Sequence, residues 1–243
     1  MPISVEASDS WAYAGSSAQT ESFTCPAGTD LLVVAITVYD VGAGAESHDL
    51  TPDALTYDSG ALSQAVENEY PTTSRQRHSA IYYLANPTTG SALDLYYDPA
   101  NNTRETMMSA FALSGCDTSD PIGATHTADL ADTDMVESVT TTYDDSILIA
   151  AAVIGRTADI DLTEDANTVE VGYTDWDTQA YDSSQAAGYR LVGSAGAYDI
   201  GWTASVGQQS AFAAAEIKEG STPPVGGSII PLVAYNRMMQ EMQ

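Results

Sequence analysis

The most continuous hydrophobic run in the chain, Leu31 to Tyr39, stands out from the alternating pattern around it. It lies between two segments rich in turn formers, Pro26 to Asp30 and Asp40 to Gly42. The run is too short for a typical helix, and its β-branched residues favour a strand. Because apolar side chains occupy consecutive positions, we predict a central strand that is buried on both faces.

A second run of the same kind, Ile147 to Ile154, follows later in the chain. The residues before the first run, Glu21 to Thr24, resemble those before the second, Glu137 to Thr140. Other matches come in the same order, and the clearest of them is Ser109 to Ala112 with Ser210 to Ala213. We therefore predict an internal duplication, with half-repeats at about residues 20–116 and 136–218.

Short apolar segments with turn residues between them fill both halves, which predicts an all-β protein. Ala54 to Tyr57 and Leu62 to Val66, on either side of Asp58 to Gly60, are typical of a hairpin. Neither half offers an obvious second layer for its apolar face. We therefore predict that the halves pair into one two-sheet β-sandwich that covers residues 1–220.

The last part of the chain, residues 221–243, has a different pattern. Ser221 to Gly227 has the composition of a linker, and after it Pro231 to Gln243 has apolar residues spaced three and four apart. This spacing predicts a short helix, which is marginal in water unless it docks. It could pack on its own sandwich, but the linker favours docking on a neighbour. The predicted docking residues are Ile229, Ile230, Leu232, Val233, Tyr235, Met238, Met239 and Met242.

The charge of the chain narrows the range of partners. The sequence has 34 acidic residues and 7 basic ones, of which Lys218 is the only lysine, and its formal net charge is -27. Nucleic acids and anionic membranes attract clustered Lys and Arg, so we expect neither as a partner. The acids are spread along the chain, and such a surface repels itself unless salt screens it. This favours a saline habitat; the alternative is an ordinary acidic extracellular protein.

Three phrases of the sequence carry a resemblance to known domains: Pro26 to Val34, Tyr82 to Ser91 and Ser114 to Asp117. They are similar to those of jelly-roll-like β-sandwich domains in structural proteins of tailed viruses. Similar domains in bacterial surface proteins are associated with carbohydrate binding. The resemblance covers about residues 20–218, implies a jelly-roll-like sandwich with a virion or adhesion role, and transfers no functional residues.

A search for catalytic motifs finds none, so we predict a protein that is not an enzyme and has no cofactor. The three histidines, His48, His78 and His126, lie in separate segments. Neighbouring acids such as Asp144 and Asp145 could bind Ca²⁺, but they lack the spacing of a known calcium loop and are better explained as turn residues.

Two further groups of residues are candidates for function. Tyr70, Trp176 and Tyr181 could stack on a sugar ring; the alternative is that they cap the ends of the core. Cys25 and Cys116 lie next to predicted central strands, so they could form one disulfide or remain two free thiols.

The predicted function is a structural virion protein of a tailed virus: a capsid decoration, spike or tail-associated subunit. Its expected partners are other virion proteins or copies of itself, with a host surface glycan as a further option. The N-terminal residues contain no signal-peptide pattern and the chain has no long apolar run, so we expect assembly in the host cytoplasm and release in the virion. The alternative is a carbohydrate-binding or adhesin module of a cell surface.

Overall fold

The computed structural model describes residues 2–41, 50–72, 75–99, 105–156, 160–176 and 182–220. These residues form strands, turns and irregular segments without a helix, so the all-β prediction is confirmed. No helix in the described ranges could therefore span a membrane. The predicted tail helix, at residues 221–243, lies outside the described residues.

The described residues of the first half form nine strands. They are β1 (Ser4–Ala14), β2 (Gln19–Thr24), β3 (Leu31–Val41), β4 (Ala54–Tyr57), β5 (Gly60–Ala61), β6 (Ser63–Thr72), β7 (Arg75–Ala85), β8 (Ala92–Asp98) and β9 (Glu105–Ser114). Five of them form an antiparallel sheet in the order β1-β9-β3-β7-β6, which we call inner sheet 1. The other four form outer sheet 1, in the order β2-β8-β4-β5.

In the second half, the part of the chain that the structure describes forms eight strands. They are β10 (Ile122–Leu130), β11 (Asp134–Thr140), β12 (Ile147–Arg156), β13 (Leu162–Glu164), β14 (Val169–Trp176), β15 (Asp182–Leu191), β16 (Ala197–Ala204) and β17 (Ser210–Ile217). Inner sheet 2 has the order β10-β17-β12-β15-β14, and outer sheet 2 has the order β11-β16-β13.

The two halves have the same topology. When β10 is matched to β1, β11 to β2 and so on, with β5 left out, the strand orders of the inner sheets agree at every position, and those of the outer sheets also agree. In each half, consecutive strands pass between the inner and the outer sheet, except at β4 to β5 in the first outer sheet and at the inner-sheet pairs β6–β7 and β14–β15. This arrangement is similar to that of a jelly roll. The predicted duplication therefore corresponds to two units of the same jelly-roll-like topology, which we call the two jelly rolls.

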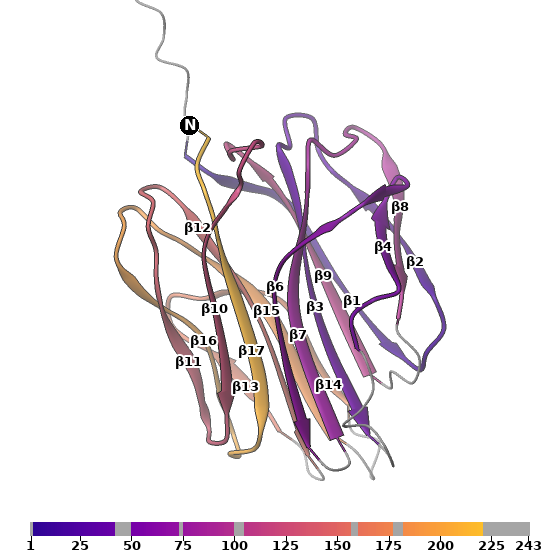
Figure 1. Cartoon of the computed structure of the whole chain (residues 1–243), viewed down its shortest axis with the longest axis vertical. Coiled ribbons are helices and arrows are strands. Elements are labelled where there is room, and N and C mark those ends of the chain that lie inside the picture. The colour runs from indigo at the N-terminus through magenta and orange to yellow at the C-terminus, as the bar shows by residue number, and fades with distance from the viewer. Residues whose placement is uncertain are drawn as a thin grey trace, which may run out of the picture.

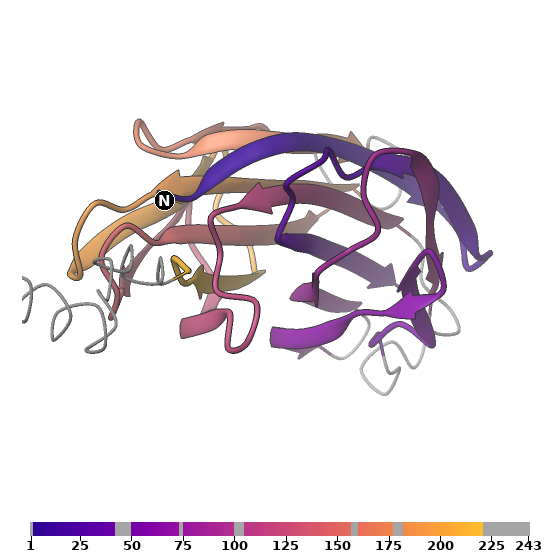
Figure 2. The ribbon, with the colours of Figure 1, turned by 90° about the horizontal axis from the view of Figure 1, so that it is seen from above.

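The four sheets stack as four layers, with the two inner sheets facing each other. In Figure 1 the outer sheets lie at the right and left edges and the inner sheets between them, and the view from above in Figure 2 shows the same two halves. One apolar core fills each jelly roll, and a third core lies between the inner sheets. The prediction of a β-sandwich is confirmed, but each half supplies both of its own layers instead of one layer of a shared pair.

The packing between the halves has approximate twofold symmetry. Strand β6 packs on β10 and β17, and its counterpart β14 packs on β1 and β9, the counterparts of β10 and β17. The halves therefore use equivalent surfaces to bind each other.

Strand β3 shows why four layers are needed. Leu32, Val34 and Ile36 point into the core of the first jelly roll, whereas Leu31 and Val33 point into the core between the halves. The prediction that this strand is buried on both faces is correct. The predicted turn at Asp58 to Gly60 is present: Asp58 and Ser59 both have positive φ, as a two-residue hairpin turn requires. It joins β4 to the short β5, whereas residues 63–66 of the predicted partner strand belong to β6 of inner sheet 1.

The interface between the halves changes from apolar to polar along the strands. At the end where β3 begins it contains Leu31, Phe111 and Ile149, among others. Nearer the other end, Thr37 Oγ1 donates to Gln185 Oε1 at 2.7 Å, and Ser183 Oγ donates to Glu105 Oε2 at 2.6 Å. These bonds satisfy polar groups that are fully buried or nearly so, and they fix the register of the two sheets.

Candidate attachment site

The two ends of the described chain meet at one end of the molecule. Ile3, just before β1, and Ile217, at the end of β17, belong to the same apolar core between the halves. Cys116, in the linker that joins the halves, belongs to it as well. The residues before the C-terminal segment therefore lie where both jelly rolls and their linker come together.

The linker pairs with the chain beyond β17. Asp117 N donates to Lys218 O at 3.0 Å, and Lys218 N donates to Pro121 O at 2.8 Å. Farther along, Glu219 forms a β-bridge with Cys116, and Gly220 N donates to Gly115 O at 2.8 Å. The backbone is thus hydrogen-bonded up to the last described residue. We call residues 115–121 and 216–220 the terminal clamp.

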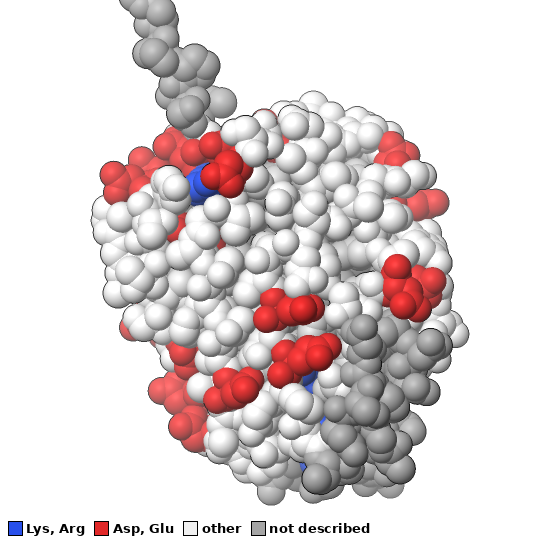
Figure 3. All heavy atoms as spheres, in the orientation of Figure 1, with Lys and Arg blue, Asp and Glu red and all other residues white. Residues whose placement is uncertain are grey.

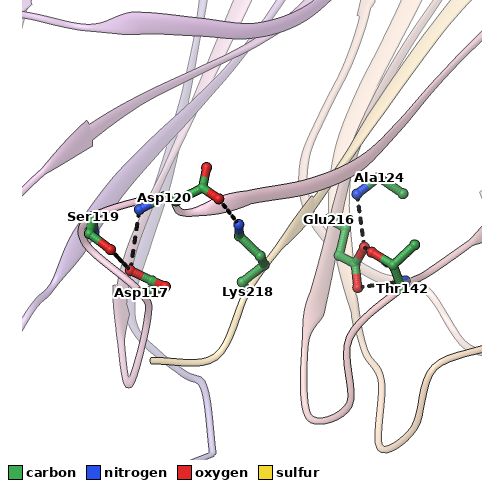
Figure 4. A network of polar contacts seen from close by, with 7 residues as sticks. All are labelled: Asp117, Ser119, Asp120, Ala124, Thr142, Glu216 and Lys218. Carbon is green, nitrogen blue, oxygen red and sulfur yellow. Dashed lines mark hydrogen bonds and ion pairs between the residues drawn. The ribbon is translucent and has the colours of Figure 1, made fainter. Parts of the chain in front are cut away.

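Glu216 anchors this clamp from the inside (Figure 4). Its fully buried carboxylate accepts hydrogen bonds from Ala124 N at 2.8 Å, Tyr143 N at 2.9 Å, and both the backbone N and Oγ1 of Thr142 at 3.0 Å. A Cβ on Gly123 would stand 2.4 Å from this carboxylate, so glycine leaves room for it. One side chain on β17 therefore joins β10 to the loop between β11 and β12.

The pKa of Glu216 reflects these bonds. Burial alone would raise it, because the charged form loses its water. The backbone donors Ala124, Thr142 and Tyr143 outweigh burial, and the pKa lies below its usual value. The carboxylate is therefore charged at neutral pH and accepts all of these bonds.

Lys218 is the second anchor. Its Nζ lies 2.5 Å from Asp120 Oδ2 and 5.0 Å from the centre of the Tyr143 ring (Figure 4 shows the ion pair). Desolvation lowers the pKa of Lys218, but the hydrogen bond and charge of Asp120 outweigh it, and the pKa is raised overall. The only lysine in the sequence is therefore a charged structural group and not a nucleophile.

Asp117 fixes the turn of the linker. Its Oδ1 accepts from Ser119 N at 2.8 Å, Ser119 Oγ at 2.6 Å and Asp120 N at 3.2 Å. The hydrogen bonds from Ser119 are the main reason why the pKa of Asp117 lies below its usual value. This turn positions Asp120 opposite Lys218.

A shallow hollow of about 430 Å³ lies over the clamp, lined by Asp117, Asp120, Tyr143, Asp144, Lys218 and Glu219. Its lining is acidic and contains no nucleophile with a neighbouring base. Within the described ranges, no three His, Cys, Asp or Glu side chains are close enough together to hold a metal ion.

Of the three residues proposed for sugar stacking, the described ranges contain Tyr70 and Trp176. Tyr70 is half-buried, packs beside Tyr39, Val153 and Ala211, and accepts a hydrogen bond from Gln209 Nε2 at 3.3 Å. It therefore belongs to the edge of the interface between the halves. Trp176 ends β14 and is half-buried, and its indole nitrogen is buried. Tyr181 lies outside the described residues.

The two cysteines do not form the disulfide that the sequence left open. Both are buried free thiols. Cys25 belongs to the core of the first jelly roll, and Cys116 to the core between the halves. Inner sheet 1 separates these cores, which explains why the thiols do not pair although both flank central strands.

The predicted docking residues, Ile229, Ile230, Leu232, Val233, Tyr235, Met238, Met239 and Met242, all lie outside the described residues. The structure therefore shows where this segment begins, at the terminal clamp, and not what it contacts. Sequence reasoning missed the clamp itself. The available signal was a pair of charged residues at the end of an apolar strand in the second half: Glu216 is the second-last residue of β17, and Lys218 directly follows it.

Charge on the face seen in Figure 3 is almost entirely acidic. Separate groups of Asp and Glu occupy its edges and lower half, with few basic atoms between them. Comparisons with protein-family models, with curated proteins and with solved structures found no match.

Proposed function

We propose that this chain is a structural subunit of a virion from a saline habitat, a capsid decoration, spike or tail-associated protein of a tailed virus, and that it is not an enzyme. The observation that carries the proposal is the terminal clamp. The residues directly before the C-terminal segment, 216–220, are hydrogen-bonded to the linker. Glu216 also bonds them to β10.

Such an anchor suits a C-terminal segment that transmits mechanical force to the fold. A pull on Gly220 acts on the backbone pairing with residues 115–121 and on the Glu216 and Lys218 side chains together. Several bonds must then break before β17 leaves its sheet. A segment that only closed over its own fold would not need this attachment.

The shape and charge agree with this role. Two jelly rolls packed through buried cores make a stiff body, because close-packed interiors transmit strain. The acidic surface keeps copies apart wherever the C-terminal segment does not join them, and concentrated salt screens its self-repulsion.

The C-terminal segment is the proposed docking element. Its apolar stripe of Leu232, Tyr235, Met239 and Met242 stabilises an assembly by roughly 1.5 to 3 kcal/mol for each large side chain that becomes buried. Docking on a neighbour then offsets the cost of ordering a short segment.

Truncation tests this proposal. A chain that ends after Thr222 keeps the terminal clamp, so it should retain the circular dichroism spectrum and melting temperature of the full chain. It should lose self-association in light scattering, or binding to purified particles. The double variant Leu232→Ser/Met239→Ser should behave like the truncation, and Asn236→Ser/Gln240→Ser, off the stripe, like the full chain. Unchanged association after truncation contradicts the proposal, and unfolding shows that the segment belongs to the core.

A further inference from the structure

Arg77, on β7, is a buried cation at the polar end of the interface between the halves. Only 1% of its surface is exposed. Its guanidinium lies 5.5 Å from the centre of the Tyr39 ring and 6.0 Å from that of Tyr70. These three residues stand side by side across inner sheet 1, because Arg77 pairs with both Tyr39 and Tyr70.

The hydrogen bonds of this guanidinium are incomplete. Nη2 donates to Gly155 O, across the interface, at 3.0 Å. Nε and Nη1 are buried and have no hydrogen-bond partner in the described part of the chain. Glu105, on the other side of Tyr39 in the same row, accepts from Ser183.

A buried guanidinium without a counter-charge is costly. Arginine stays protonated in proteins, so it cannot avoid the cost by losing its proton. The two aromatic faces offset part of the cost. A water molecule would satisfy the free donors but would leave the charge uncompensated.

We propose that the free donors of Arg77 bind a monovalent anion of the size of chloride between the two jelly rolls. One negative charge matches that of the guanidinium. A small spherical ion can also accept from Nε and Nη1 together, because it has no preferred direction for the bonds. This site is independent of the C-terminal segment and of the function proposed above.

The net charge of the protein sets the conditions for binding. A chain with formal charge -27 repels anions from its surface, so the site fills only when halide is concentrated. Chloride then stabilises the fold by mass action, in addition to any screening of the surface acids.

Melting temperatures in two sodium salts test the proposal with the full chain. The wild type should melt higher in sodium chloride than in sodium methanesulfonate at equal sodium concentration. The expected difference is about 4 to 7 °C when chloride is present at about twenty times its dissociation constant. The variant Arg77→Met should lose this difference. The control Arg75→Met removes a half-buried arginine from the same strand and should keep it. Equal melting temperatures of the wild type in the two salts overturn the proposal.

A second measurement needs no variant. Crystals of the wild type grown in sodium bromide should give an anomalous scattering peak next to the Arg77 guanidinium, in contact with Nε or Nη1. An ordered water there, without an anomalous signal, overturns the proposal even if Arg77→Met fails to fold.

Discussion

The ring of Tyr39, on β3, lies directly against the backbone of Gly155, on β12. A Cβ added at Gly155 would stand 2.0 Å from Cε2 of this ring. The two residues belong to equivalent strands of the two halves, and Arg77 binds the carbonyl of the same glycine. The jelly rolls can therefore approach closely at this end because Gly155 has no side chain.

Gly155→Ala should therefore destabilise the protein by about 1 to 3 kcal/mol, because the buried Tyr39 ring must shift to make room. Urea unfolding at constant salt measures the change. The matched control is Gly193→Ala, where an added Cβ has no neighbour within 4 Å, and it should stay within about 0.5 kcal/mol of the wild type. Equal effects of the two substitutions would show that the jelly rolls do not approach as described.

Glu216→Gln should cost about 1 to 3 kcal/mol at pH 7, because an amide cannot accept from all the donors that face the carboxylate. The folded pKa of Glu216 lies below the unfolded value of about 4.3. Its contribution is therefore complete above the unfolded pKa and is lost as the pH falls through the folded pKa.

Urea unfolding at pH 7 and pH 3 should show this loss as a smaller difference between the wild type and Glu216→Gln at the lower pH. The exposed Glu164, changed to Gln, is the control and should cost little at either pH. A difference between wild type and Glu216→Gln that grows in acid would contradict the assignment of a charged, hydrogen-bonded carboxylate.

The thermal stability of the whole chain should rise between 0.05 M and 2 M NaCl, because salt screens repulsion among acids that have few basic partners. Differential scanning calorimetry measures the melting temperature. Sodium methanesulfonate should raise it too, since screening does not depend on the anion. A melting temperature that stays constant in both salts would remove the argument for a saline habitat.

Cys25 and Cys116 should both titrate as free thiols after denaturation without reductant. In the folded protein both should react slowly with a thiol reagent such as DTNB, because burial raises the pKa of Cys25, and that of Cys116 to about 12. Mass spectrometry after alkylation provides the count. One disulfide in place of two thiols would contradict the placement of the cysteines in separate cores.

The strands with strong side-chain patterns could be predicted from the sequence. The boundaries of β4 agree with the prediction, and β3 and β12 begin where predicted and extend two residues farther. Their consecutive β-branched residues need burial on both sides, so the pattern and the packing agree. The duplication could be found for the same reason, since equivalent strands need equivalent side chains.

Strands β1, β10 and β14 were largely missed, and they share a physical reason. Each lies at the edge of an inner sheet and alternates small or acidic residues with partly buried ones. Their segments have the composition of loops, and β10 falls between the two predicted half-repeats, residues 20–116 and 136–218. Pairing with a neighbouring strand holds them in place, which sequence pattern alone does not reveal.

The sequence did not predict four layers, because the strands of the outer sheets have a weak hydrophobic pattern. Some of their buried residues, such as Phe23 and Val139, come singly between polar ones. The polar row around Arg77 and Tyr39 was missed as well, because its members are far apart in the chain and meet only through the register of β6, β7, β3 and β9.

The equivalence of the two inner sheets also bears on how such a protein could be built. A surface that binds its own counterpart about a twofold axis needs to be specified only once. A single half with this surface would bury it by pairing with an identical copy, and that pairing would weaken on dilution. The short peptide from Gly115 to Pro121 makes the two surfaces permanent neighbours, so the four layers hold together at any concentration.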